Sequence, residues 1–180
     1  MKPMPQLQEL LEKAKAHSMF GTKMRSVIKK ADPEGIKAVV AQQFEVGKQI
    51  IAAGLCPIIE PEVDIHSADK ESIEEILKKE LTDHLNQLDS TENVMLKLSL
   101  PTRVNHYKEL MDHPRCVRVV ALSGGYSRDE ANEILSKQAG MIASFSRALL
   151  EGLAYEQSDS DFDNVLAGTV DAIYNASIKG

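Results

Sequence analysis

The residue best placed to do chemistry is Lys97, which lies within the apolar run 94–100 (VMLKLSL). If this run is a β-strand, its side chains alternate between two faces, and Lys97 shares the less apolar face with Met95 and Ser99. Burial disfavours the charged form of a lysine, and a neutral amine is a nucleophile toward carbonyl carbon. The competing interpretation is a solvated lysine near the exposed end of a strand.

Two further pairs of ionisable residues occur at a two-residue spacing. Lys23 and Arg25 fall in a strand expected over 19–26, and Glu60 and Glu62 fall in an extended segment over 56–63. A two-residue step of about 6.6 Å puts both members of a pair on one face. Paired cations favour an anion, and paired carboxylates suit acid–base catalysis. A solvated strand end and an acidic loop are the respective alternatives.

A second candidate anion site lies farther along the chain. The segment 123–125 (SGG) follows a nearly continuous apolar strand at 116–122 and precedes a capping box at 127–130. Backbone N–H groups at such a junction can bind phosphate, although an ordinary strand-to-helix turn has the same sequence. Arg147 directly follows a short strand expected over 141–146, so it lies near that strand's carboxyl end.

These residues require parallel strands to bring them together. Short apolar runs alternate with helical patterns, without repeats or a linker, so we expect one α/β domain over 1–180. The expected helices cover 5–17, 32–54, 67–88, 104–111, 127–135, 147–150 and 162–178. A (β/α)8 barrel collects functional groups at the carboxyl ends of its strands. A doubly wound sheet would also do so, but its glycine fingerprint after the first strand is absent. To the charged helix at 67–88 we assign no chemistry.

Composition argues against several other classes of function. The net charge is −6 and no basic stripe is present, so neither nucleic acid nor an anionic membrane is an expected partner. The sequence shows no signal peptide and no apolar window of roughly 18 residues, so we expect a cytoplasmic protein. The two cysteines and five histidines lack metal-binding spacing. We therefore expect no metal and no cofactor, with buried cysteines and surface histidines.

A nucleophilic amine, a carboxyl pair and two anion sites suit a phosphorylated carbonyl substrate that is bound as an iminium. The protonated nitrogen stabilises an adjacent carbanion, so the neighbouring carbon–carbon bond can break or form without a metal. This is the chemistry of class I aldolases.

Five segments in order resemble the class I fructose-bisphosphate aldolases, bacterial branch. They are 21–26 (GTKMRS), 57–62 (PIIEPE), 94–97 (VMLK), 122–127 (LSGGYS) and 144–149 (SFSRAL). The similarity covers essentially the whole chain. It implies a TIM barrel and the reversible cleavage of fructose 1,6-bisphosphate to dihydroxyacetone phosphate and glyceraldehyde 3-phosphate in glycolysis.

The resemblance also implies a role for each site residue. Lys97 would form the Schiff base, and Glu60 would act in the acid–base steps around carbinolamine dehydration. Glu62 and Lys23 would support the lysine, and Arg25 would help to hold the distal phosphate. The phosphate next to the ketone would be received by Ser123, Gly124 and Arg147. Animal members of the family carry glycine immediately before this last arginine, whereas this chain has Ser146.

A whole barrel takes about 250 residues, and the chain has 180. The resemblance aligns it with roughly the fourth to eighth strand units, so we expect a C-terminal fragment without the family's aspartate of the first strand and lysine of the third. Two hypotheses follow. The first is an aldolase whose missing strands come from upstream sequence or another chain. The second is a catalytically incompetent partial barrel whose open edges favour binding or assembly, homo-oligomers included.

Overall fold

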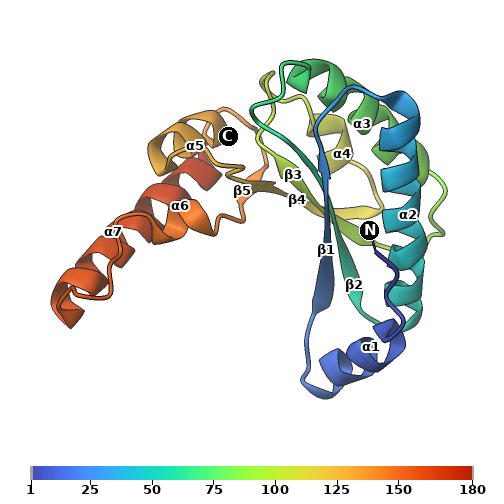
Figure 1. The fold of residues 1–180 in the computed structure, drawn as a ribbon, viewed down its shortest axis with the longest axis horizontal. Helices are drawn as coiled ribbons and strands as arrows, with labels where there is room; N and C mark the ends of the chain where they lie inside the picture. The colour runs from blue at the N-terminus through green and yellow to red at the C-terminus, as the bar shows by residue number, and fades with distance from the viewer. Residues whose placement is uncertain (1, 180) are drawn as a thin grey trace.

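The chain folds as a parallel β-sheet flanked by helices (Figure 1). The structure is a computed structural model and describes residues 2–179. Each strand pairs in parallel with the next one along the chain. The strands are β1 (Gly21–Ile28), β2 (Cys56–Val63), β3 (Val94–Ser99), β4 (Cys116–Leu122) and β5 (Ile142–Ala143). The sequence predicts this α/β class with a parallel sheet. Parallel neighbours need a crossover connection, and the predicted helices between the strands supply it.

The helices lie between and after the strands. They are α1 (Leu7–Ala16), α2 (Pro33–Ala52), α3 (Lys70–Leu85), α4 (Lys108–Met111), α5 (Arg128–Leu135), α6 (Arg147–Leu150) and α7 (Asp159–Ile178). Helices α2 and α3 pack beside one another along one side of the sheet, whereas α7 runs outward from β5 (Figure 1). Among residues 2–179, we find no helix whose length and hydrophobicity would carry it through a bilayer.

Local sequence signals set the ends of several helices. Pro33 opens the first turn of α2, where its missing N–H has no intrahelical partner to lose. Gly54 follows the end of α2 with φ of +81°, a conformation in which a Cβ would be strained. Before α5, the side chains of Ser127 and Glu130 form the predicted capping box.

The alternation predicted for β3 is confirmed. Val94, Leu96 and Leu98 are buried and join the hydrophobic core, whereas Met95 and Lys97 on the other face are partly exposed. The core also contains the apolar stripes of α2 and α3. Lys97 therefore projects from the face of the sheet opposite to its packed aliphatic layer.

Several element bounds differ from those expected. Helices α1 to α5 are shorter than predicted, and α4 begins at Lys108 rather than at 104. Strand β1 begins at Gly21 rather than at residue 19, and it pairs with β2 as far as Ile28. Strand β5 contains two residues instead of 141–146, because only Val120 and Ala121 of β4 pair with it. Helix α7 begins at Asp159 rather than 162 because the Ser158 side chain, accepting from Asp161 N–H, caps it.

The expectation that α3 is a purely solvated helix with one apolar stripe is wrong at its first two turns. Lys70 Nζ lies 2.5 Å from Glu74 Oε1 and 2.9 Å from the carbonyl oxygen of Leu100, and both side chains are buried. His106 is buried as well, with Nε2 3.1 Å from the Glu74 carbonyl oxygen. The reason is tertiary: the segment after β3 covers this end of α3, which helical periodicity alone does not reveal.

Replacing Lys70 by methionine is expected to lower the free energy of unfolding by about 3–5 kcal/mol, because Glu74 would stay buried without its cation. Urea unfolding at pH 7 measures this loss. The double variant Lys70→Met/Glu74→Gln removes both charges and keeps an acceptor for the Thr102 N–H, which Glu74 now binds. It should be more stable than Lys70→Met, and an equally unstable double variant would contradict the assignment.

Candidate functional site

A polar hollow of about 410 Å³ lies over β1, β2 and β3 and the segments that follow β4 and β5. It is lined by all eight residues that the sequence singles out, namely Lys23, Arg25, Glu60, Glu62, Lys97, Ser123, Gly124 and Arg147. They lie on three neighbouring strands, in the turn that follows β4, or, for Arg147, at the start of α6. The parallel sheet thus brings together groups that are more than 120 positions apart in the sequence. Their chemical roles stay predictions.

The Glu60 carboxylate lies between two lysines. Its Oε2 is 2.8 Å from Lys23 Nζ, and its Oε1 is 3.5 Å from Lys97 Nζ. Glu60 is only 3% exposed, and the Lys97 side chain is 17% exposed. The buried Oε2 atom accepts no hydrogen bond of good geometry, so Lys23 interacts with it through charge alone. A carboxylate this close to an amine can exchange a proton with it after a small movement.

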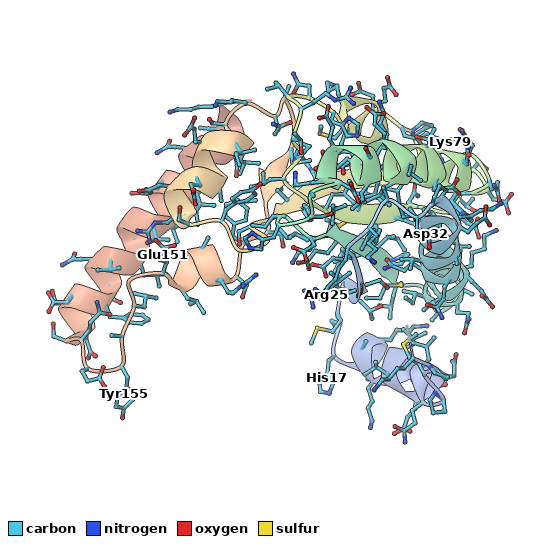
Figure 2. The ribbon with its side chains drawn as sticks, turned by 45° about the horizontal axis from the view of Figure 1, so that its top comes forward. His17, Arg25, Asp32, Lys79, Glu151 and Tyr155 are labelled. Atoms are coloured by element: carbon cyan, nitrogen blue, oxygen red, sulfur yellow. The ribbon has the colours of Figure 1, made fainter. Side chains whose placement is uncertain are left out.

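A second ion pair lies beside the first. Arg25 Nε donates to Glu62 Oε2 at 2.5 Å, and this hydrogen bond together with the charge of Glu62 raises the pKa of Arg25. Half of the Arg25 side chain stays exposed, and it projects from β1 (Figure 2). The sequence suggests an anion site at Lys23 and Arg25. In the structure each of these cations instead has a carboxylate partner on β2, because the side chains meet diagonally across the two strands.

The hollow nevertheless carries an excess of positive charge. Four cationic side chains line it, at positions 23, 25, 97 and 147, and they outnumber the two carboxylates. Low-dielectric walls concentrate the field of such an excess within a concave site. The hollow is therefore suited to bind an anionic ligand.

The turn after β4 brings backbone and guanidinium groups together. Gly124 and Gly125 have φ of +66° and +118°. A Cβ on Gly124 would lie 2.6 Å from the Ile65 side chain, so glycine is required for this close approach. A Cβ on Gly125 would lie 3.9 Å from Arg147 Nη2, which places the guanidinium next to this turn. Ser123 is 5% exposed and also faces the hollow.

Several residues of the site were not predicted. Leu122, Ser144 and Ser146 also line the hollow. The two serines are two positions apart and directly follow β5. In an extended segment this spacing puts both side chains on one face, which is the signal that could have identified them. Because β5 is so short, neither serine belongs to a regular strand.

Two buried polar side chains that sequence reasoning missed anchor the backbone behind the ion pairs. Gln43 Nε2 donates to the Glu60 carbonyl oxygen at 3.2 Å, and its Oε1 accepts from the Glu60 N–H at 2.9 Å. Ser99 Oγ donates to the Val63 carbonyl oxygen at 2.7 Å and accepts from the Val63 N–H at 3.0 Å. A glutamine within the apolar stripe of α2 was the available signal.

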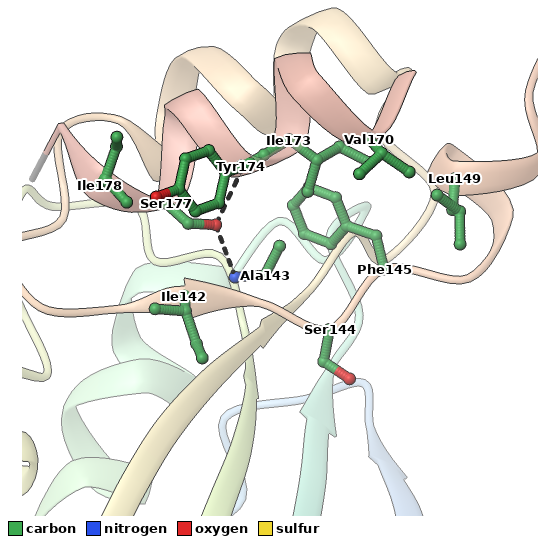
Figure 3. Close-up of a pocket in the computed structure, with 10 residues that line it drawn as sticks. All are labelled: Ile142, Ala143, Ser144, Phe145, Leu149, Val170, Ile173, Tyr174, Ser177 and Ile178. Atoms are coloured by element: carbon green, nitrogen blue, oxygen red, sulfur yellow. Dashed lines mark hydrogen bonds between the residues drawn. The ribbon is translucent and has the colours of Figure 1, made fainter. Parts of the chain in front are cut away.

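A different hollow, of about 420 Å³, lies between β5 and α7 and is mainly apolar (Figure 3). Its lining contains no lysine, arginine, histidine or carboxylate. Ser177 on α7 accepts a hydrogen bond from the Ala143 N–H at 3.1 Å, which attaches the helix to the short strand. Tyr174 and Ile178 in this lining are exposed. The hollow offers mainly apolar surface, with the hydroxyl groups of two serines and one tyrosine as its polar side-chain groups.

Within residues 2–179, no three side chains of histidine, cysteine, aspartate or glutamate are grouped closely enough to hold a metal ion. The lysine, arginine and glutamate side chains of the hollow are therefore considered as acids, bases, nucleophiles and anion-binding groups.

Comparison of the sequence with curated proteins gives strong matches. The chain is 55% identical to the class 1 fructose-bisphosphate aldolase of Porphyromonas gingivalis, 58% to that of Synechocystis and 57% to that of Clostridium acetobutylicum. Each alignment covers 99% of this chain and 59–60% of the relative. The chain is homologous to a C-terminal portion of the class 1 fructose-bisphosphate aldolases. It spans about three fifths of the length of these relatives. No protein-family model matches the sequence.

Solved structures show the same fold. The fructose-bisphosphate aldolase of Plasmodium falciparum superimposes with a TM-score of 0.64 at 20% identity, over 96% of this chain and 62% of that chain. A Corynebacterium glutamicum protein gives a TM-score of 0.55 at 14% identity, over 93% of this chain and 54% of its own. The five parallel strands thus have the arrangement of a partial TIM barrel, as the sequence predicts.

Replacing Glu60 by glutamine is expected to make stability depend on phosphate. Without the carboxylate, Lys23 and Lys97 repel one another, and we expect a loss of about 1–3 kcal/mol. Inorganic phosphate can bind in the hollow next to the two amines and restore stability by binding only the folded state. Thermal unfolding in phosphate and in chloride at equal ionic strength measures this difference. Glu45→Gln, an exposed substitution on α2, is the control, and equal responses of both variants would contradict the prediction.

Proposed function

We propose that this chain carries the Schiff-base part of a fructose-bisphosphate aldolase site, in which fructose 1,6-bisphosphate is cleaved reversibly to dihydroxyacetone phosphate and glyceraldehyde 3-phosphate. The observation that carries the proposal is the contact of 3.5 Å between the Lys97 amine and the buried Glu60 carboxylate. Homology to proteins named as class 1 fructose-bisphosphate aldolases supports it. Because the chain spans three fifths of these relatives, the activity of the whole enzyme is part of the proposal.

Formation of the imine requires three proton movements, and Glu60 is placed for the first and the last. Its carboxylate takes a proton from the Lys97 ammonium, the lone pair of the free amine attacks the ketone carbon, and a proton then passes from the nitrogen to the former carbonyl oxygen to give the carbinolamine. The protonated carboxyl then donates to the carbinolamine hydroxyl, which leaves as water while the nitrogen lone pair forms the iminium bond. Glu60 ends as a carboxylate next to the cationic nitrogen. The Lys23 ammonium, 2.8 Å from the other carboxylate oxygen, stabilises this anionic form.

Cleavage follows from the electron demand of the iminium. The electrons of the bond between the α- and β-carbons of the iminium move toward the nitrogen and leave an enamine, while the β-carbon departs as the carbon of an aldehyde. The hydroxyl on this β-carbon gives up its proton in the same step, and the Glu60 carboxylate that dehydration regenerates is the acceptor assigned to it. In the family this chain resembles, the first barrel strand carries a further active-site aspartate, so a complete barrel is expected for the full reaction.

The two phosphates of the substrate fit two parts of the hollow. Arg147 and the backbone of 123–125 would bind the phosphate next to the ketone, which the position of the Arg147 guanidinium beside the Gly125 turn supports. Arg25 on β1 would bind the distal phosphate. Its ion pair with Glu62 keeps the guanidinium oriented while half of the side chain stays exposed.

The edges of the sheet indicate where the rest of a barrel would join. In the part of the chain that the structure describes, β1 and β5 are the outer strands, each paired on one side. We infer that these edges, with the apolar hollow between β5 and α7, contact the remaining barrel strands or a second copy of the chain. The two free thiols and the acidic net charge are compatible with a cytoplasmic protein that does not bind nucleic acid.

Borohydride reduction in the presence of dihydroxyacetone phosphate is expected to add the reduced ligand covalently to Lys97. Mass spectrometry of the intact chain and of its peptides measures the adduct and its position. Lys97→Arg keeps the positive charge but provides no amine for an imine, so it should show no adduct. Lys29→Arg, at the end of β1 outside the hollow, should be labelled like the unsubstituted chain. A folded sample without an adduct contradicts the proposed function.

Substitutions of Arg147 and Arg25 should have different effects on the concentration of dihydroxyacetone phosphate that half-saturates the same assay. Dihydroxyacetone phosphate has only the phosphate next to the ketone, so Arg147→Met should raise its half-saturating concentration at least about 10-fold, as expected when a charge-assisted contact of roughly 1.5–3 kcal/mol is lost. Arg25→Met should change this concentration by less than about 3-fold, because its assigned phosphate is absent from this ligand. Equal effects of the two substitutions would refute the division of roles.

A further inference from the structure

Helix α2 contributes one polar side chain to its buried face, and that side chain binds the backbone of Glu60. Gln43 is 0% exposed. Its neighbours on this face, Val40, Phe44 and Gly47, are apolar or small. A buried amide is costly unless its hydrogen-bonding groups are paired. Both ends of the Gln43 amide are paired, and both bind one residue, Glu60.

This double contact fixes the main chain from which the carboxylate projects. The amide accepts from the Glu60 N–H at 2.9 Å and donates to its carbonyl oxygen at 3.2 Å, so rotation of either peptide group would break a bond. The next residue, Pro61, has no N–H and cannot contribute a donor to the sheet. The carboxylate positions relative to Lys23 and Lys97 therefore depend on a side chain that lies outside the hollow.

A second anchor holds the facing strand. Register pairs between β2 and β3 are limited, in the described part of the chain, to Ile58 with Met95 and Ile59 with Leu96. Beyond them, Ser99 on β3 binds both backbone groups of Val63 on β2. The strands are thus tied together on the far side of Glu60 and Lys97. Between these two ties, the backbone from which the Glu60 side chain projects is held by Gln43.

We propose that Gln43 is a positioning residue, which acts through the Glu60 backbone to keep the carboxylate within proton-transfer distance of Lys97. The inference rests on the proposed function, because the effect on chemistry passes through imine formation at Lys97. Gln43 contacts neither the amine nor the phosphate-binding turn. It should therefore affect the rate of the proton-dependent step and leave ligand affinity alone.

The test measures the rate of borohydride-trapped adduct formation against the concentration of dihydroxyacetone phosphate. In Gln43→Met, which has a similar length but no hydrogen-bonding amide, the rate at saturation should fall at least about 10-fold, since displacements near 1 Å have effects of this size or larger. The half-saturating concentration should stay within about 2-fold. Val40→Ala, one turn earlier on the same buried face, is the matched control for loosened packing of α2. Its saturated rate should stay within about 2-fold of that of the unsubstituted chain.

Gln43→Glu provides a conservative rescue. Burial raises the pKa of an introduced carboxyl group, and its protonated form again offers one donor and one acceptor. As the pH is lowered from roughly 8 to 6, the saturated rate of adduct formation in Gln43→Glu should approach that of the unsubstituted chain. The ratio of the Gln43→Met rate to that of the unsubstituted chain should stay constant over the same range. Deficits that follow the same pH profile in both variants would overturn the proposal, as would a Val40→Ala deficit as large as that of Gln43→Met.

The outcomes also separate this inference from the proposed function. If the unsubstituted chain forms no adduct, the proposed function fails, and a crystal structure of Gln43→Met decides the positioning role. A Glu60 carboxylate displaced by more than about 1 Å relative to the Lys97 amine supports it. An unchanged carboxylate overturns it.

Discussion

The site depends on one buried carboxylate that two lysines share. Removing a charge from water costs several kcal/mol, and the attraction between charges about 4 Å apart near a protein surface is of similar size, about 4 kcal/mol. Such a cluster therefore adds little net stability to the fold. The cluster instead determines geometry. The Glu60 carboxylate lies between the Lys23 and Lys97 amines and orients them, whereas without it the two amines would repel one another.

The sheet and its helices keep this cluster intact. Parallel pairing brings the site residues of β1, β2 and β3 side by side, and the aliphatic face of β3 packs into the core on the other side. Glu62 holds Arg25 in a second pair, so that neither carboxylate on β2 lies buried without a cation. The same strands that supply the reactive groups thus supply the charges that make their burial tolerable.

Local patterns in the sequence predicted much of this arrangement. Alternation within β1, β2 and β3 predicted which charged residues share a face, and the turn after β4 was visible as Ser-Gly-Gly. The diagonal pairs between strands were not predictable, because strand register is a tertiary property. Helical periodicity likewise located the apolar stripes of α2 and α3. It did not show that Gln43 and Lys70 face other elements rather than solvent, since a single sequence does not say what a polar position meets.

The anchoring of Glu60 by Gln43 also limits how relatives of this chain can diverge in length. The loop that joins β1 to α2 can grow or shrink, because Pro33 restarts the helix wherever the loop ends. A residue gained or lost between Pro33 and Gln43 would instead turn the amide by about 100° around the helix axis and away from β2. We therefore expect insertions and deletions to be tolerated before Pro33 and selected against in the first half of α2, although no residue there touches the hollow.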